Sequence, residues 1–141
     1  MKILFLDIDG VLNSVRSAIA FAGYPMPKRD GDKFDEVAVG LIRAVCVKTN
    51  CVICLSSTWR IGIDPTKLGQ QLNLPIMDKT PVTSAGIRGK EIDMYLKNAQ
   101  VDKYAIVDDD SDMLPEQLPY FVKTSHINGL SYENYLELLK N

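Results

Sequence analysis

The sequence predicts an α/β fold built on a central parallel sheet. Short apolar runs that suit strands alternate along the chain with stretches in which apolar residues recur at helical spacing. The runs are apolar throughout and do not alternate with polar residues, which indicates strands that are buried on both faces. A parallel sheet covered by helices on both faces makes a three-layer architecture.

The expected elements follow one another with short connections. We expect strands at 2–7, 51–56, 103–108 and 120–124, a short strand within 75–87, and helices at 35–48, 64–72, 88–97 and 131–140. Asp35, Asp64 and Ser131 stand where N-cap residues are preferred, and Pro65 suits the first position of a helix. These helix starts support the alternation of strands and helices.

Residues 13–34 are expected to be irregular, because two glycines and two prolines punctuate them. Basic residues also lie here: Arg16, Lys28, Arg29 and Lys33. They could follow a phosphate backbone. Because Asp30 and Asp32 are interleaved with them, a solvated loop is the other interpretation.

Length and composition indicate one domain over residues 1–141. The chain of 141 residues has 46% hydrophobic and 24% charged residues, which is ordinary for a globular protein. No run approaches the roughly 18 apolar residues of a membrane span, and the first apolar stretch is too short for a signal peptide. We therefore expect a cytoplasmic protein without a membrane partner.

The three cysteines do not suggest a disulfide scaffold or a metal site. Cys51 and Cys54 have CxxC spacing, but they lie within an expected strand, where residues three apart point to opposite faces. With Cys46, they are expected to fill the core of a protein in a reducing compartment.

Polar residues end three of the expected strands: Asp7, Ser56 and Asp108. In an open parallel sheet, the functional site lies beyond the carboxyl ends of the strands. Asp9 follows Asp7 at strand spacing, and Asp109, Asp110 and Asp112 follow Asp108. Carboxylates from neighbouring strand ends repel one another unless a cation lies between them, and Mg²⁺ prefers such oxygen ligands. Either acidic motif alone could instead be a solvated loop.

Four segments resemble the motifs of the haloacid dehalogenase (HAD) superfamily. They are Asp7-Ile8-Asp9-Gly10-Val11, Val52-Ile53-Cys54-Leu55-Ser56, Arg88-Gly89-Lys90, and Ile106-Val107-Asp108-Asp109 with Asp112 following. More narrowly, DIDGVLN, LSSTWR, RGKEIDMYL and IVDDDSDM are similar to the small phosphatase domains of polynucleotide end-repair proteins. The resemblance implies a HAD-like Rossmannoid fold and a phosphatase that acts beside a kinase or ligase.

The resemblance also implies roles for individual residues. Asp7 would attack phosphorus and form an aspartyl-phosphate, and Asp9 would serve as acid and then base. Ser56 would bind the phosphoryl oxygens, with Ser57 as the neighbouring candidate. Asp7, the Ile8 carbonyl and Asp108 would hold Mg²⁺, supported by Asp109 or Asp112, and Asp9 is counted among the acidic residues of this metal site.

The cation of the third motif is left open between two residues. Arg88 and Lys90 both stand near the start of the expected helix, and residues two apart do not share a helix face. The end-repair pattern favours Arg88, whereas the commoner lysine of the superfamily favours Lys90. We expect one of them to point into the site and the other to be solvated.

The spacing leaves no room for the large cap domain that many members of the superfamily carry. Only 30 residues separate Ser57 from Arg88. An uncapped site would admit a large substrate. Trp59 and Arg60 would then lie on its rim, where an aromatic ring and a guanidinium could bind a base and a phosphate. In the other interpretation, Trp59 packs against the next helix.

The leading hypothesis is an Mg²⁺-dependent phosphatase that removes 3′-terminal phosphates from nucleic-acid ends. A 5′-nucleotidase or small-molecule phosphatase is the alternative within the enzyme class. A catalytically dead module that binds nucleic acid or a partner protein is the alternative outside it. A signalling receiver domain is disfavoured. Receivers carry an acidic pair after the first strand and the phosphorylated aspartate in mid-chain, whereas this chain has its DxD motif first and its run of three aspartates last. The oligomeric state is left open.

Overall fold

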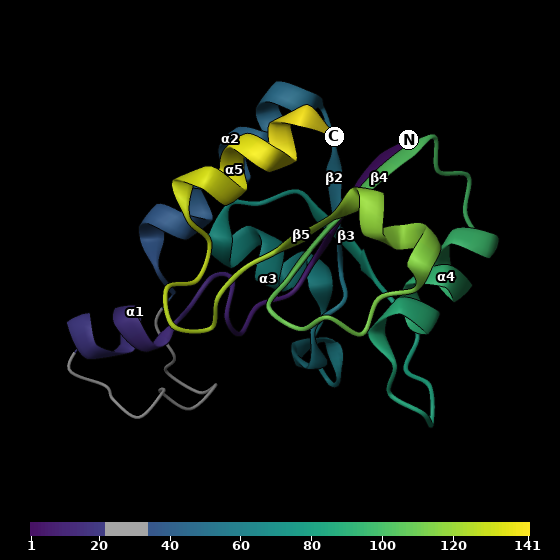
Figure 1. The fold of residues 1–141 in the computed structure, drawn as a ribbon, viewed down its shortest axis with the longest axis horizontal. Coiled ribbons are helices and arrows are strands. Elements are labelled where there is room, and N and C mark those ends of the chain that lie inside the picture. The colour runs from purple at the N-terminus through teal and green to yellow at the C-terminus, as the bar shows by residue number, and fades with distance from the viewer. Residues whose placement is uncertain (22–33) are drawn as a thin grey trace.

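A computed structural model describes residues 1–21 and 34–141, and within them five strands form one parallel sheet (Figure 1). The strands are β1 (Lys2–Leu6), β2 (Val52–Leu55), β3 (Ile76–Lys79), β4 (Lys103–Asp108) and β5 (Phe121–Lys123). Their order across the sheet is β3-β2-β1-β4-β5, and every neighbouring pair is parallel. The α/β fold with a central parallel sheet is therefore confirmed.

Helices connect the strands. They are α1 (Val15–Ala20), α2 (Glu36–Thr49), α3 (Pro65–Leu72), α4 (Arg88–Lys97) and α5 (Tyr132–Lys140), with two 3₁₀ turns, η1 (Thr58–Arg60) and η2 (Pro115–Tyr120). Asp35, Asp64 and Ser131 cap the helices for which they were expected, each by accepting a backbone N–H in the first turn.

The prediction of an irregular stretch over 13–34 is wrong at its start. Ser14 and Ser17 form a capping box, in which each hydroxyl accepts the other residue's backbone N–H, and the short helix α1 follows. The glycines and prolines lie further along. Lys28, Arg29 and Lys33 lie outside the described residues.

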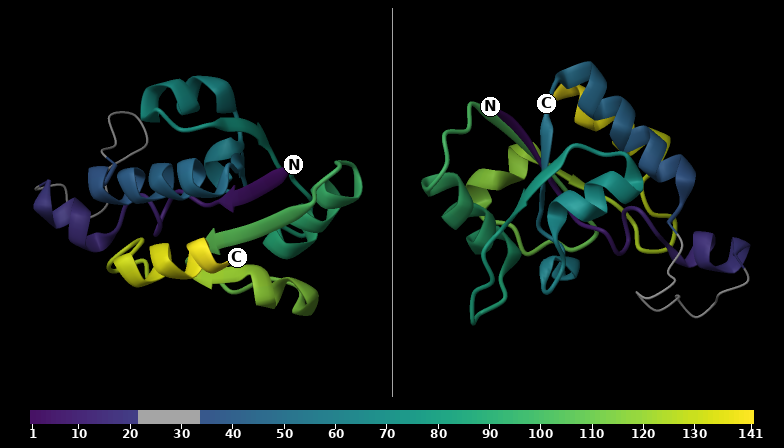
Figure 2. Two further views of the ribbon diagram at one scale, coloured as in Figure 1. Left: turned by 90° about the horizontal axis from the view of Figure 1, so that it is seen from above. Right: turned by 180° about the vertical axis from the view of Figure 1, so that it is seen from behind.

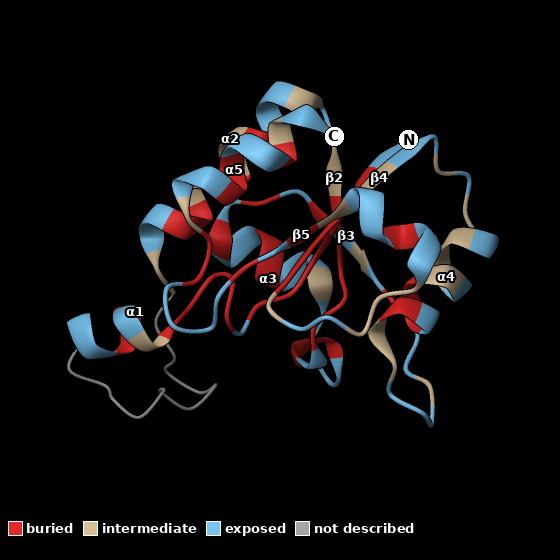
Figure 3. Cartoon of the chain, viewed as in Figure 1, coloured by how far each residue is buried: buried red, intermediate tan, exposed pale blue. Residues whose placement is uncertain are grey.

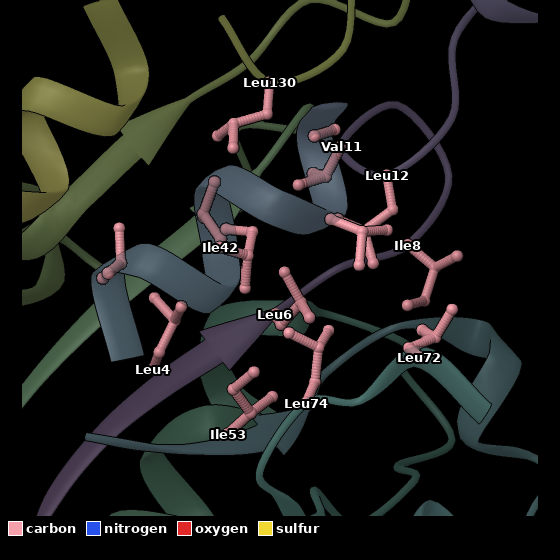
Figure 4. Close-up of a cluster of buried hydrophobic side chains, with 14 of the residues drawn as sticks. Leu4, Leu6, Ile8, Val11, Leu12, Ile42, Ile53, Leu72, Leu74 and Leu130 are labelled. Atoms are coloured by element: carbon pink, nitrogen blue, oxygen red, sulfur yellow. The ribbon is translucent and has the colours of Figure 1, made fainter. Parts of the chain in front are cut away.

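The sheet separates two apolar clusters, which gives the three layers. Leu4, Leu6, Ile53 and Leu55 pack with α2, α3 and α5 on one face, and Ile3, Phe5, Cys54 and Ile106 pack with α4 on the other. Figure 2 shows the sheet edge-on between helices, and Figure 4 shows the first cluster in close-up. In Figure 3 the buried residues follow the strands and the inner faces of the helices. Alternate strand residues thus serve opposite faces.

The cysteines follow this division. Cys54 is buried in the α4-side cluster, whereas Cys51 packs against the other one. The expected separation of the CxxC pair is confirmed, and all three thiols are free. The Cys51 thiol instead lies 3.7 Å from the Sγ of Cys46, at the end of α2.

Backbone hydrogen bonds continue past the strands and align the residues that follow them. The Asp7 N–H donates to the Val107 carbonyl at 3.1 Å, and the Ser56 N–H donates to the Leu6 carbonyl at 3.0 Å. The chain after β1, β2 and β4 is therefore held in register at one edge. Between Ser57 and Arg88 the chain forms only η1, α3, β3 and loops, so no cap domain is inserted there. Among the described residues, no helix has the length and apolar character needed to cross a membrane.

The buried face of α2 provides a test of this packing. Ile42 is fully buried against the sheet, whereas Val37 on the same helix is 72% exposed. We expect Ile42→Ala to lower the free energy of unfolding by about 2–5 kcal/mol, because it removes buried methyl groups and leaves a cavity. Val37→Ala should change it by no more than about 0.5 kcal/mol. Urea denaturation measures both, and equal effects would contradict the packing described.

Candidate active site

The polar residues after β1, β2 and β4 meet at the carboxyl edge of the sheet, as the sequence predicts. Asp7 and Ser56 each stand one position beyond the paired residues Leu6 and Leu55, and Asp108 ends β4 next to them. All three site residues are buried, with exposures of 6%, 0% and 1%. Parallel pairing thus brings distant sequence positions together in one buried polar cluster.

Three carboxylates gather at this edge of the sheet. One carboxylate oxygen from each of Asp7, Asp108 and Asp109 lies within 4.8 Å of the others. Gly10 makes the approach of Asp109 feasible: its φ is +82°, and a Cβ at this position would collide with the Asp109 carboxylate. Hard oxygen donors at this spacing match the ligands that Mg²⁺ takes in proteins.

Burial raises the pKa values of two of these carboxyl groups, Asp7 and Asp108. Burial, and secondarily the charge of Asp108, raise the pKa of Asp7 to about 9. Burial also raises the pKa of Asp108 to about 6, although Arg88 opposes the shift. A cation at this cluster would favour the charged forms of both groups. The donor set therefore fits a divalent metal ion.

Arg88 is the cation that the fold supplies, and Lys90 is not. The Arg88 Nη1 lies 2.6 Å from the Asp108 Oδ2 and 3.5 Å from the Asp7 Oδ1. Lys90 is exposed, and no ion pair within the described residues joins it to these carboxylates. Of the two candidates, the structure thus brings Arg88 and not Lys90 to these carboxylates, because residues two apart on α4 point in different directions.

Asp112 supports the position of Arg88 and lies outside the carboxylate cluster. Its Oδ2 accepts the Arg88 backbone N–H at 2.9 Å, and its carbonyl accepts the Gly89 N–H at 3.0 Å. Ile87, which precedes α4, provides no side-chain cap. Asp112 therefore caps α4 from the segment after β4. Its expected support of the metal is not seen among the clustered oxygens.

Asp9, which was expected among the metal residues, lies outside this cluster of oxygens. It is exposed on the loop after β1, and its Oδ1 accepts hydrogen bonds from the Asn13 Nδ2 at 2.9 Å and the Trp59 Nε1 at 3.0 Å. Strand β1 ends at Leu6, so the strand spacing that would place Asp9 beside Asp7 does not extend to Asp9.

Several buried polar atoms at this edge have no hydrogen-bond partner within the described part of the chain. They are the Ser56 Oγ, the Thr80 Oγ1, the Arg88 Nε and the Asp112 Oδ1. Buried polar groups are normally paired, so orphaned ones need an explanation. Ser56 and Arg88 flank Asp7, and both can donate a hydrogen bond. Both are therefore available to bind an oxygen of an anionic group.

The rim prediction for Trp59 and Arg60 is wrong. Their exposures are 4% and 3%, so neither side chain can stack a base or grip a phosphate at the surface. Trp59 packs on Phe34, with ring centroids 5.4 Å apart. Ser57 is also buried, and its hydroxyl accepts the Trp59 N–H at 3.1 Å, which caps η1.

Arg60 instead ties three segments of the site together. Its guanidinium donates to the Ser57 carbonyl at 2.7 Å and pairs with the Glu91 Oε1 at 2.7 Å. Its Nε donates to the Thr80 carbonyl at 3.1 Å, and the Glu91 Oε2 accepts the Thr83 N–H at 2.7 Å. The pair therefore joins the turn after β2 and the loop after β3 to α4, which carries Arg88.

Sequence reasoning missed three residues that hold this edge together. Glu91 pairs with Arg60, Asn13 binds Asp9, and the Thr124 hydroxyl donates to the Gly10 carbonyl at 2.6 Å. A charged residue on the inner side of α4 was a signal for Glu91. Asn13 and Thr124 carry no pattern of their own, because their partners come from loop geometry.

The chain was compared with family models, curated proteins and solved structures. The family model described as "HAD domain in Swiss Army Knife RNA repair proteins" matches residues 3–135. No curated protein and no solved structure matches the chain.

The buried ion pair allows a direct test of the scaffold. Glu91→Gln keeps the shape of the side chain but leaves the Arg60 guanidinium buried without a counter-charge. We expect a loss of about 3–5 kcal/mol in the free energy of unfolding. The control is Asp93→Asn on the same helix, where an exposed pair with Lys97 at 2.9 Å should contribute less than about 1 kcal/mol. Equal losses in the free energy of unfolding, measured by urea denaturation, would contradict the structural role of the Arg60–Glu91 pair.

Proposed function

The chain belongs to the family of HAD domains in Swiss Army Knife RNA repair proteins, and from this premise we propose that it is an Mg²⁺-dependent phosphomonoesterase. Its proposed substrate is a 3′-terminal phosphate on a nucleic-acid end. The proposal goes beyond membership of the family, because it specifies the reaction, the metal ion and the substrate.

One observation carries the proposal: a buried carboxylate stands at the same sheet edge as two buried donors that have no partner among the described residues. Asp7 is 6% exposed, and the Ser56 Oγ and Arg88 Nε beside it have no hydrogen bond among the described residues. A phosphoryl group carries oxygens that accept such bonds. An anion bound there would satisfy both donors and face the Asp7 carboxylate.

The proposed mechanism assigns each side chain one task. A carboxylate oxygen of Asp7 attacks phosphorus and forms an aspartyl-phosphate while the bond from phosphorus to the leaving oxygen breaks. Asp9 donates its proton to that oxygen. Asp9 then takes a proton from water, which attacks phosphorus and releases the Asp7 carboxylate and inorganic phosphate. Ser56 and Arg88 stabilise the negative charge of the transferring group.

Asp7, Asp108 and Asp109 would hold the metal ion, since their oxygens form the clustered set. When bound, Mg²⁺ would supply positive charge that keeps these carboxylates ionised and offsets the charge of the phosphoryl group. Arg88 already contacts Asp108 and Asp7, so it would orient both carboxylates.

The substrate class rests on the openness of the site and on the family. Between β2 and α4 the described chain forms no domain that could cover the site. Enzymes that act on small molecules often close over them to exclude water, whereas a nucleic-acid end needs an open approach. The family is named for RNA repair. A kinase or ligase would be the expected partner enzyme, since either acts on the ends that a 3′-phosphatase prepares.

The assignment of Asp7 predicts the effect of one substitution. Asp7→Asn should abolish phosphate release, because an amide is a poor nucleophile and a poor metal ligand. Phosphate release in the presence of Mg²⁺ measures this, with circular dichroism to confirm that the variant folds. Activity within about tenfold of the wild type, a barrier change of only ~1.4 kcal/mol, would contradict the role of Asp7. An inactive wild type would favour a binding module.

Substrate preference tests the proposed substrate, a 3′-terminal phosphate on a nucleic-acid end. A 3′-phosphorylated oligoribonucleotide should have a kcat/KM at least about tenfold above that of a 3′-mononucleotide, because contacts outside the phosphate pocket add binding free energy. The advantage should shrink with added salt, as contacts to backbone phosphates do. A 5′-phosphorylated oligonucleotide is the matched control. Efficient turnover of mononucleotides at low salt would instead support the nucleotidase alternative.

A further inference from the structure

The carboxyl of Asp9 is held in place although it is exposed. The Trp59 Nε1 and the Asn13 Nδ2 donate to it at 3.0 and 2.9 Å. Both bonds end on the same oxygen, Oδ1. An exposed aspartate is ordinarily hydrated by water, and ordering its side chain costs conformational entropy. The two donors on one oxygen therefore hold the Asp9 side chain in one orientation, although its exposure would otherwise let it rotate.

The two donors are themselves immobilised. Trp59 is 4% exposed, its backbone N–H is bound by the Ser57 hydroxyl, and its ring packs on Phe34. Asn13 is 4% exposed, and its Oδ1 accepts the Gly10 N–H at 3.0 Å. Rigid donors of this kind set both the position and the rotation of the carboxyl group that they bind.

The choice of oxygen has a chemical consequence. Because Oδ1 already accepts two N–H groups, a proton on this carboxyl is carried by Oδ2. The two donors thereby separate the oxygen that is anchored from the oxygen that exchanges a proton. A general acid must present its proton toward the leaving oxygen within hydrogen-bond reach.

We propose that Trp59 and Asn13 are positioning residues, which orient the Asp9 carboxyl so that Oδ2 delivers its proton to the leaving oxygen. The inference rests on the proposed phosphatase function. In the step concerned, Asp7 forms its bond to phosphorus, the bond from phosphorus to the leaving oxygen breaks, and the Asp9 proton ends on that oxygen. Trp59 thus acts through Asp9 from a buried place and does not contact the substrate.

The test uses leaving groups that differ in their need for a proton. The oxygen of p-nitrophenol leaves readily as an anion, whereas the ribose oxygen of a 3′-phosphorylated dinucleotide leaves poorly unless it is protonated. The variable measured is kcat/KM, which reports only the steps up to formation of the aspartyl-phosphate and so excludes its later hydrolysis. Trp59→Phe keeps a ring in the core but removes the N–H, and Asn13→Ala removes the second donor.

We expect each variant to lower kcat/KM for the dinucleotide by about tenfold or more, within the contribution of a general acid. For p-nitrophenyl phosphate the loss should stay below about threefold. Asp9→Asn should cause the largest loss of kcat/KM for the dinucleotide relative to p-nitrophenyl phosphate. Adding Trp59→Phe to Asp9→Asn should cause no further loss of this kind. Ile42→Ala is the packing control, because it opens a cavity in the same apolar core and leaves the hydrogen bonds of Trp59 and Asn13 to Asp9 in place. Its effect should be equal on the two substrates.

Equal losses on both substrates in Trp59→Phe and Asn13→Ala, or no loss in either, would overturn the inference. If Trp59→Phe does not fold, Asn13→Ala alone decides in the same way. A different result would contradict the proposed function itself. A wild type that hydrolyses neither ester contradicts that function, whereas a selective loss in Asp9→Asn without one in the two donor variants contradicts only the positioning role.

Discussion

Repulsion among the carboxylates at the edge of the sheet is the constraint on which the rest of the site depends. Asp7, Asp108 and Asp109 converge within 4.8 Å, and the first two are buried. Burial raises the pKa of both Asp7 and Asp108, so the folded chain alone disfavours their charged state. Arg88 offsets part of this charge, and a bound cation would offset the rest.

The surrounding side chains fix the position of the Arg88 guanidinium. Asp112 caps α4 at the Arg88 backbone, and the buried pair of Arg60 and Glu91 fastens α4 to the turn after β2. A buried ion pair contributes little net stability, but breaking it is costly, so it enforces one arrangement of the segments that it joins. The parallel sheet fixes the carboxylates, and these polar ties fix the position of the cation against them.

Much of this could be predicted from the sequence, and the rest depended on loop geometry. The strands and the principal helices follow from apolar runs and N-caps. The convergence of Asp7, Ser56 and Asp108 follows from the rule that parallel strands share a carboxyl edge. Trp59 and Arg60 were misplaced because adjacency to Ser56 in sequence does not reveal which way η1 turns. The turn carries both side chains inward, where Asp9 and Glu91 bind them.

The central proposal is that the carboxylate cluster binds a divalent cation, and thermal unfolding with and without Mg²⁺ tests it most directly. Because the folded pKa of Asp7 is raised to about 9 from an ordinary value near 4, the metal-free protein loses stability as pH rises through this range. Saturating Mg²⁺ should raise the Tm by several degrees at pH 8, and by less at pH 6, where protons compete. Asp108→Asn should remove most of this shift. An unchanged Tm at pH 8 with Mg²⁺, or an equal shift in Asp108→Asn, would contradict the account.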